Sequence, residues 1–368
     1  MNERITCDLC GEEILSDSYT VEGRRLCESC YDYDTFRCEC CGGRFMMANE
    51  VGDDHISVCE NCYEEHYHRC DRCNSLVHDS DVFWEDDNAY CRNCYEDSHC
   101  GIIRDYYYKP RPIFYKRPKE SRVRYYGVEL EIDCGGKDNE SAESIYDIAN
   151  QCEDVLYIKS DSSLDEGMEL VSHPCSVQYH KESFPWKDVM KEAVQLGYRS
   201  HNTSTCGLHI HIGRDDLGET VEAQEEVISR IMFFFESHWN EIFKFSRRGE
   251  YAVNRWASRY GYKDKPKDIL EDAKKARKGR YTCVNITNRS TVEIRIFKGT
   301  LKWNTFMAAI ELVDSICDNA IRLSDEELHK QSWNDFVLSI DRDYTELIKY
   351  LKEKRLYVNE PVEDEEEV

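Results

Sequence analysis

The chain has no long hydrophobic run and no excess of positive charge, and each shortage excludes a class of protein. No uninterrupted apolar stretch approaches the roughly 20 residues that a membrane-spanning helix needs. The first residues, MNERITCDLC, lack the apolar middle of a secretory signal peptide. These absences predict a soluble, cytoplasmic protein with no membrane partner.

Basic residues are outnumbered, with 48 Lys and Arg against 73 Asp and Glu, so the formal net charge is -25. Like charges repel across about a Debye length, roughly 8 to 10 Å. This balance disfavours a general attraction to nucleic acid or to anionic membranes and leaves only local basic patches. The acidic segment 359–368 predicts a solvated tail.

Cysteine, in contrast, is abundant, with 20 in 368 residues. In a long chain without a secretion signal, cysteines indicate thiolate metal ligands rather than disulfides. The first hundred residues contain paired CxxC motifs in three copies of one pattern: Cys7, Cys10, Cys27 and Cys30; Cys38, Cys41, Cys59 and Cys62; Cys70, Cys73, Cys91 and Cys94. The first cysteines of successive copies are 31 and 32 residues apart, a period that indicates an internal repeat.

Each copy is predicted to bind one structural Zn²⁺. Four thiolates close a tetrahedral site around zinc at about 2.3 Å, which leaves no open position for chemistry. Some thirty residues bury too little apolar surface to fold without the metal. The polar stretch after each second CxxC predicts a short helix whose first amides face the thiolates. We therefore expect treble-clef or ribbon-like modules over about 1–35, 36–67 and 68–100.

The spacing of the cysteines leaves open both the exact ligands and the partner of the array. Cys40 and Cys100 lie outside the quartets, and either could replace a ligand in its module. The array is expected to bind a protein partner, with nucleic acid less favoured, and the alternative is a folded spacer.

A change of composition follows the array, where residues 101–122 are rich in tyrosine, basic residues and proline. Proline removes a backbone donor and resists helix, so the segment predicts an extended interdomain linker. Basic residues between tyrosines also suit stacking on single-stranded bases. The acidic balance of the chain favours the linker.

Three later segments place pairs of polar residues at every second position of an apolar pattern. The pairs are Glu129 and Glu131 in GVELEID, His209 and His211 in CGLHIHIG, and Glu293 and Arg295 in STVEIRIFKG. A strand with this period carries both members of a pair on one face. Carboxylates and imidazoles bind divalent cations, and arginine binds phosphate, so the three pairs together predict a metal and phosphate site.

Two hairpins extend this constellation. In KSDSSLDEGMELVSHP, Asp161 and Glu169 flank a turn that contains Gly167, and a hairpin there would bring both carboxylates to one surface. The segment TCVNITNRSTVEIRIF predicts a second hairpin that would place Asn285 and Arg289 near Glu293. Helical periodicity over 141–152, 185–198, 221–245 and 304–323 completes an α+β domain with an antiparallel sheet, predicted over residues 123–358.

The order of these motifs, GVELE, then GMELVSHP, then CGLHIHIG, then NRSTVEIRIFKGTL, resembles the amidoligase family within the glutamine synthetase-like carboxylate-amine ligases. The resemblance covers about residues 125 to 323. It implies an antiparallel-sheet funnel with flanking helices, in which carboxylates and histidine hold Mg²⁺ or Mn²⁺ around the phosphates of ATP.

The resemblance also implies roles for single residues. Glu131, Asp161 and Glu169 would hold the cation on the substrate side. Glu129, His209 and Glu293 would hold the cation between the phosphates. Arg295, with Arg289, would neutralise charge on the transferred γ-phosphoryl group. His211 and Asn285 would contact ATP or substrate, and an ordinary sheet histidine is the alternative for His211.

The implied reaction forms an amide from an amine and a carboxylate of an amino acid, peptide or protein. The carboxylate attacks the γ-phosphate to give an acyl phosphate, and the amine then displaces phosphate. This chemistry needs no nucleophilic side chain, so Cys206 and Cys283 are expected to be structural. Two alternatives stay open: a non-enzymatic zinc-finger adaptor with a degenerate ligase fold, and a dinuclear metallohydrolase that uses the two histidines.

Overall fold

The computed structural model describes residues 5–14, 17–53, 56–85, 87–99, 101–121, 123–275 and 279–357. The chain separates into two compact units, Met1–Cys100 and Gly101–Val368. The predicted acidic tail and Cys100 lie outside the described residues. Among the helices that are described, none is both long and apolar enough to cross a membrane.

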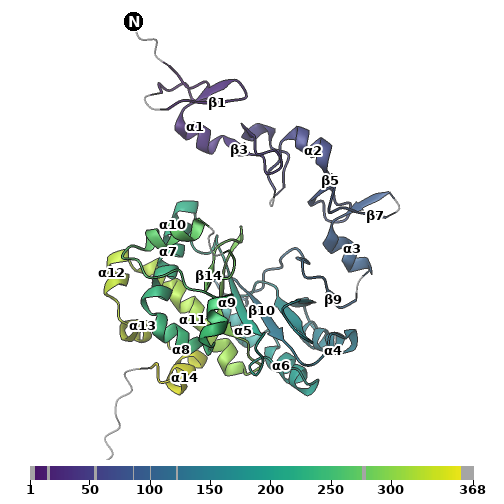
Figure 1. Ribbon diagram of the computed structural model, residues 1–368, viewed down its shortest axis with the longest axis vertical. Helices are drawn as coiled ribbons and strands as arrows, with labels where there is room; N and C mark the ends of the chain where they lie inside the picture. Colours follow the sequence, from purple (N-terminus) through teal and green to yellow (C-terminus); the bar gives the residue numbers. More distant parts are fainter. Residues whose placement is uncertain are drawn as a thin grey trace, which may run out of the picture. The chain divides into compact units, whose positions relative to one another are not determined.

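A seven-stranded sheet forms the centre of the second unit within the described residues (Figure 1). Its order is β14-β15-β13-β10-β12-β11-β9. The strands are β9 (Ile103–Arg104), β10 (Tyr126–Ile132), β11 (Leu156–Lys159), β12 (Met168–Ser172), β13 (Gly207–Gly213), β14 (Val284–Asn285) and β15 (Thr291–Lys298). All neighbours pair antiparallel except β9 and β11, which pair parallel. The sheet is therefore mixed, whereas the sequence predicts an antiparallel one.

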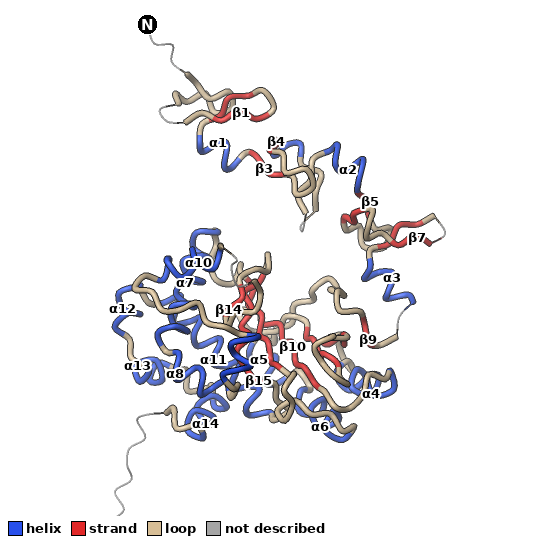
Figure 2. Tube along the Cα trace, viewed as in Figure 1, coloured by secondary structure: helices blue, strands red, loops and turns tan. Residues whose placement is uncertain are grey.

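Helices pack against this sheet, and those predicted over 141–152, 185–198 and 304–323 are present within three residues of the predicted bounds. They are α4 (Asn139–Ala149), α5 (Val177–Glu182), α6 (Trp186–Gln195), α7 (Val221–Ser237), α8 (Trp239–Ser246), α9 (Glu250–Trp256), α10 (Pro266–Lys274), α11 (Trp303–Arg322), α12 (Asp325–Lys330), α13 (Trp333–Ser339) and α14 (Thr345–Glu353). Figure 2 shows α4 and α6 on the β9 side of the sheet and α7, α8 and α11 on the β14 side. The single helix predicted over 221–245 is broken at His238 into α7 and α8.

The two faces of the sheet differ because the central strands alternate apolar and polar residues. Val128, Leu130 and Ile132 of β10 are fully buried in the main hydrophobic core with α7 and α11. The residues between them, Glu129 and Glu131, point to the other face. The helices thus cover one face, and the polar residues of the central strands are left on the second.

The segment 101–121 differs from the extended linker that its sequence predicts. Ile103 and Arg104 form β9 and pair with β11, and Tyr108 is buried against Tyr157 at a ring distance of 5.5 Å. Tyr115 donates its amide to the carbonyl of Pro174 at 2.9 Å. The apolar surface of the tyrosines explains this packing, since an aromatic ring gains free energy when it leaves water.

The first unit repeats one small fold. Its hairpins and turns are built from β1 (Tyr19–Val21), β2 (Arg24–Leu26), β3 (Thr35–Arg37), β4 (Arg44–Met46), η1 (Met47–Asn49), β5 (Tyr67–Arg69), β6 (Leu76–His78), β7 (Phe83–Glu85) and β8 (Asn88–Tyr90). The helices α1 (Glu28–Tyr33), α2 (Glu60–His66) and α3 (Arg92–His99) begin inside the second CxxC of each copy. The predicted helices are therefore present, but each starts earlier than predicted, directly after the first cysteine of that pair.

These elements confirm an α+β protein with flanking helices and N-terminal cysteine clusters. The funnel that the family resemblance implies stays a prediction.

Candidate functional site

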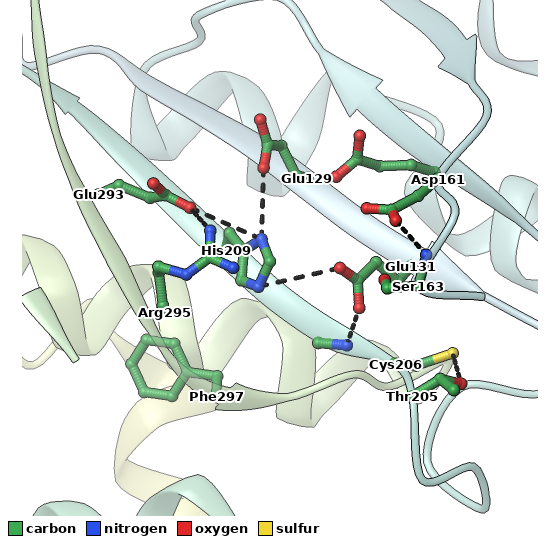
Figure 3. A network of polar contacts seen from close by, with 12 residues as sticks. Glu129, Glu131, Asp161, Ser163, Thr205, Cys206, His209, Glu293, Arg295 and Phe297 are labelled. Carbon is green, nitrogen blue, oxygen red and sulfur yellow. Dashed lines mark hydrogen bonds and ion pairs between the residues drawn. The ribbon is translucent and has the colours of Figure 1, made fainter. Parts of the chain in front are cut away.

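Polar side chains from distant motifs meet on the sheet face opposite the helices (Figure 3). The strand register sets three pairs across the sheet: Glu131 with Glu169, Glu129 with His209, and His211 with Glu293. Paired residues of neighbouring antiparallel strands point to the same face. Four motifs that lie far apart in the sequence thus form one cluster, which we call the carboxylate–imidazole cluster.

Glu129 is at the centre of this cluster. One of its carboxylate oxygens lies 3.3 Å from Nδ1 of His209, and the other lies 3.2 Å from Nε2 of His211. Nε2 of His211 is buried and lacks the geometry of a hydrogen bond, despite that short distance. Burial opposes ionisation of Glu129, but the two imidazoles outweigh it and hold its pKa well below the usual value.

Glu293 is held in place by residues of its own hairpin, and Asn285 lies beside it as predicted. The amide of Asn285 donates to Glu293 Oε2 at 2.7 Å, and Arg295 contacts the other oxygen. Nε of Arg295 is buried without a hydrogen-bond partner. The carboxylate is thus fixed, while two buried nitrogens of the cluster, on His211 and Arg295, have unused capacity for a ligand.

Glu131, Asp161 and Glu169 gather on the other side of the cluster. Glu131 accepts the amide of Gly207 and lies 4.0 Å from His209, and the amide of Ser163 fixes Asp161 at 2.6 Å. Burial raises the pKa of Glu169 well above its usual value, and the charges of Glu129, Glu131 and Asp161 raise it further. Lys159, 3.4 Å away, offsets only part of this repulsion. Ionisation of Glu169 is therefore opposed both by burial and by the neighbouring carboxylates.

Divalent cations fit these donors. Glu129, Glu169 and His209 form one group whose ligand atoms lie within 4.8 Å of one another, and Glu129, His211 and Glu293 form another. Ligands at about 2.1 Å from Mg²⁺ are at most about 4.2 Å apart, so a small contraction would close either group. Glu129 belongs to both groups, which suits two neighbouring ions. The implied set of Glu129, His209 and Glu293 also lies close together, with His209 Nδ1 3.3 Å from Glu129 and 3.7 Å from Glu293. His211 is an additional neighbour of Glu129 and Glu293.

Arg248 is a residue of the cluster that the sequence reasoning missed. It follows α8 and is 8% exposed, and its pKa is lowered to about 10 by burial, against the charge of Glu131. A Cβ added at Gly207 would overlap Arg248 Nη2 and lie 2.8 Å from His209 Nε2. A side chain at position 207 would displace the guanidinium from its present place. No period or motif singles out Arg248, since it lies in the short loop between α8 and α9.

The predicted Arg289, in contrast, lies exposed on the loop between β14 and β15. The rim above Arg295 is formed instead by Tyr281, whose ring centroid lies 6.0 Å from the guanidinium carbon. Arg280 bridges the hydroxyls of Tyr281 and Tyr106. Tyr106 comes from the segment predicted as a linker, and Lys159 lies 5.3 Å from its ring. Aromatic and cationic groups thus border the cluster on two sides.

Two cysteines of the second unit are predicted to be structural. Cys206 and Cys283 are buried, and burial raises the pKa of both thiols, that of Cys206 to about 12. A protonated, buried thiol is a poor nucleophile. Both residues fit a structural role.

In the first unit each predicted quartet forms one cluster of four thiols. Tetrahedral zinc with bonds of about 2.3 Å separates neighbouring sulfurs by about 3.8 Å. The observed Sγ–Sγ distances are 3.8 Å for Cys10 and Cys27, 4.0 Å for Cys41 and Cys59, and 3.7 Å for Cys73 and Cys91. The quartets therefore have the spacing of zinc sites. Cys40 is exposed and outside its quartet.

Comparisons with known proteins agree with the sequence resemblance. Residues 138–317 match the model of the family described as "Putative amidoligase enzyme". The matched segment contains Asp161, Glu169, His209, His211 and Glu293, and the strand with Glu129 and Glu131 immediately precedes it.

Comparison with solved structures gives no further assignment. Two structures of 3-hydroxy-3-methylglutaryl-coenzyme A reductase from Streptococcus pneumoniae are 12% identical, with a TM-score of 0.17. They cover 66% and 65% of this chain, and this chain covers 64% and 72% of theirs. At that TM-score the likeness carries no argument about fold or function. No curated protein matches the chain.

Proposed function

From the amidoligase family that residues 138–317 match, we infer that the second unit is an ATP-dependent carboxylate-amine ligase. It joins a carboxylate to an amine through an acyl phosphate. We place the catalytic domain at about 123–358 and count Glu129, Glu131, Asp161, Glu169, His209, His211 and Glu293 as its cation-binding residues.

One observation carries this proposal: Glu129 belongs to two groups of cation ligands, and Arg295 and Arg248 lie at the same cluster. Two neighbouring divalent ions with arginines beside them are what charge stabilisation of a transferred phosphoryl group requires. A dinuclear hydrolase would use the same ligands. The arginines favour phosphate chemistry because guanidinium matches phosphate oxygens in shape and charge.

The chain's own residues have separate tasks in this reaction. Mg²⁺ or Mn²⁺, when bound, would supply charge that neutralises the phosphates. Glu129, with the two histidines, and Glu293, fixed by Asn285, position the ions. Arg295, whose buried Nε has no hydrogen-bond partner, would contact the γ-phosphoryl oxygens, and Arg248, beside Gly207 and His209, would add a second positive charge. As phosphate transfers, one bond to the carboxylate oxygen forms and the bond to the β,γ-bridging oxygen breaks. The amine then attacks the carbonyl carbon and phosphate leaves.

For the first unit we propose three structural Zn²⁺ ions, one in each quartet. The sulfur spacing supports this proposal, and no open coordination position remains for substrate.

The ligase proposal is tested by trapping the acyl phosphate. The full chain is incubated with Mg²⁺, ATP, hydroxylamine and a panel of carboxylates, and hydroxamate and phosphate are measured. We expect ATP-dependent hydroxamate that a Glu293→Gln change reduces by about 100-fold or more, because an ion loses its anionic ligand. Glu143→Gln, an exposed carboxylate on α4, is the matched control and should keep full activity.

Glu293→Gln should lower the unfolding temperature of the metal-free chain, since it leaves the buried Arg295 without its carboxylate partner, so activity is compared at a temperature where the metal-free variant is still folded. Hydrolysis of phosphate or peptide bonds without nucleotide would favour the metallohydrolase. Absence of both ATP binding and turnover would favour the adaptor.

A further inference from the structure

A second feature lies beyond the carboxylate–imidazole cluster: a pocket of about 500 Å³ among α6, α8, α11 and α14. The helices that line it are found in the lower part of the second unit in Figure 1. Its wall carries Arg199, His201, Arg247, Lys302 and Lys354 against one acid, Glu353. That acid already pairs with Lys302 at 3.3 Å. In a chain with a net charge of -25, this pocket is locally cationic.

The pocket is joined to the cluster by two consecutive arginines. Arg247 ends α8 with a left-handed φ of 62°, so its side chain leaves in a different direction from that of Arg248. Arg248 donates to the carbonyl of Phe297 at 3.1 Å and enters the cluster. Arg247 donates to the next carbonyl, of Lys298, at 3.1 Å and lines the pocket. The two guanidiniums therefore lie along the end of β15.

A β-bulge adds Lys298 to this line. Between the pairs Leu208–Phe297 and Ile210–Ile294, β15 has one residue more than β13. The bulge changes which face the following residues take. Phe297 is consequently buried in the core, while Lys298 pairs with Gly207 and shares its face with the cluster. Without the bulge, Lys298 would point to the helices.

The result is a series of cations that are close enough to influence one another, which we call the cationic track: Arg295, Arg248, Lys298, Arg247 and Lys354. Burial, with the charges of Arg247, Lys298 and Lys354, lowers the pKa of His201. Burial, with the charges of Arg247 and Arg248, likewise lowers the pKa of Lys298. Within the described residues, no ion pair neutralises Arg247, Arg248, Lys298 or Lys354. Such mutual repulsion costs stability unless an anion binds.

We propose that the pocket binds a second carboxylate of the ligase's substrate, so that the substrate is a dicarboxylic acid or an acidic peptide rather than a monocarboxylic acid. This inference rests on the proposed ligase function. One carboxylate is activated at the cation cluster, and the other is held at the far end of the cationic track by Lys354 and Arg247.

The geometry favours such an extended anion. A pocket of this volume accepts a ligand of several residues or of a comparable small molecule. Arg247 Nη1 donates to His201 Nδ1 at 2.9 Å, so that imidazole carries its proton on Nε2 and can donate to an oxygen. Ser200, also in the wall, donates to the carbonyl of Glu131 at 2.8 Å. The wall of the pocket thus touches the backbone of a cation-binding residue.

The test compares matched ligands that differ by one charge: glutarate and pimelate, each against its monomethyl ester. Binding to the full chain is measured by calorimetry, and turnover by ATP-dependent hydroxamate formation. We expect each diacid to bind more tightly than its ester. Lys354→Gln should raise the Kd and KM of the diacids about tenfold and leave those of the esters unchanged, as expected for loss of one charge-assisted contact. Lys349→Gln, exposed on the same helix, is the control.

Arg247→Asn gives a second variant, because asparagine tolerates the left-handed conformation. This change should weaken binding of the diacids in the same way.

Equal binding of diacid and ester, or equal effects of Lys354→Gln and Lys349→Gln, would overturn the proposal. Inorganic phosphate that displaces the diacids, and binds more tightly than they do, would overturn the assignment to carboxylate. Diacid selectivity in binding without any hydroxamate would refute the ligase and keep the pocket. Equal turnover of diacid and ester would refute the assignment of the pocket and keep the ligase.

Discussion

At the scale of single residues, the cluster depends on one position without a side chain. Gly207 donates its amide to Glu131 and leaves the space that Arg248 Nη2 and His209 Nε2 border. The atoms that a methyl group would displace all belong to the carboxylate–imidazole cluster. A change there should damage the site before it damages the fold.

Gly207→Ala should therefore reduce Mn²⁺ affinity and hydroxamate formation by at least about tenfold, with a small change in unfolding temperature. Gly127→Ala is the matched control, because Gly127 is also a glycine in a central strand and its added Cβ would lie 3.6 Å from the nearest atom, an ordinary contact. Mn²⁺ binding is measured by electron paramagnetic resonance. If the two variants behave alike, the close approach of Arg248 and His209 to Gly207 does not affect metal binding or activity.

At the scale of elements, neighbouring zinc modules share residues of their hydrophobic cores. The core of the first module, with Cys7, Val21 and Leu26, is completed by Met46 from β4 of the second. The core of the second module contains Leu76 from β6 of the third. Asn49 also donates to the carboxylate of Glu22 at 2.9 Å. The first and second modules thus each take an apolar side chain from the module that follows.

Met46→Ala should weaken the first module although the residue belongs to the second. Truncation of a buried methionine costs about 2 kcal/mol or more. In modules whose folding is coupled to metal binding, this cost appears as a loss of zinc affinity of about 30-fold. Titration with a chromogenic chelator should show that one Zn²⁺ of the three is released at a lower chelator concentration than the other two. Met47→Ala, whose side chain is 44% exposed, is the control. Release that is identical in both variants would argue against a shared core.

At the scale of the whole molecule, the two units obtain their stability from different sources. The second unit has one extended hydrophobic core, whereas the first has three small ones built around cysteines. Small cores need the metal, and large ones do not.

Chelation should consequently unfold only the first unit. We expect three Zn²⁺ per chain by elemental analysis, and chelator-treated protein should be cleaved by protease within residues 1–100 while the second unit keeps its thermal transition. Cys41→Ser should lose one zinc, and Cys40→Ser, which changes the exposed neighbour outside the quartet, should keep all three. A stoichiometry near one, or unfolding of both units together, would contradict this division.

The sequence by itself determined the features that depend on local spacing. Cysteine spacing specified the three quartets, because two CxxC pairs joined by a short hairpin have few other ways to meet. Period-two alternation specified which strands carry Glu129, Glu131, His209, His211 and Glu293, because a half-buried strand has only two faces.

The tertiary structure alone decided which of those side chains share a partner. Strand register placed His211 beside Glu293, and a bulge turned Lys298 towards the cluster. The left-handed turn at Arg247 separated two adjacent arginines, and the burial of Tyr108 fixed a predicted linker to the sheet. Register, bulges and packing arise from contacts between segments far apart in the chain, and no local pattern encodes them.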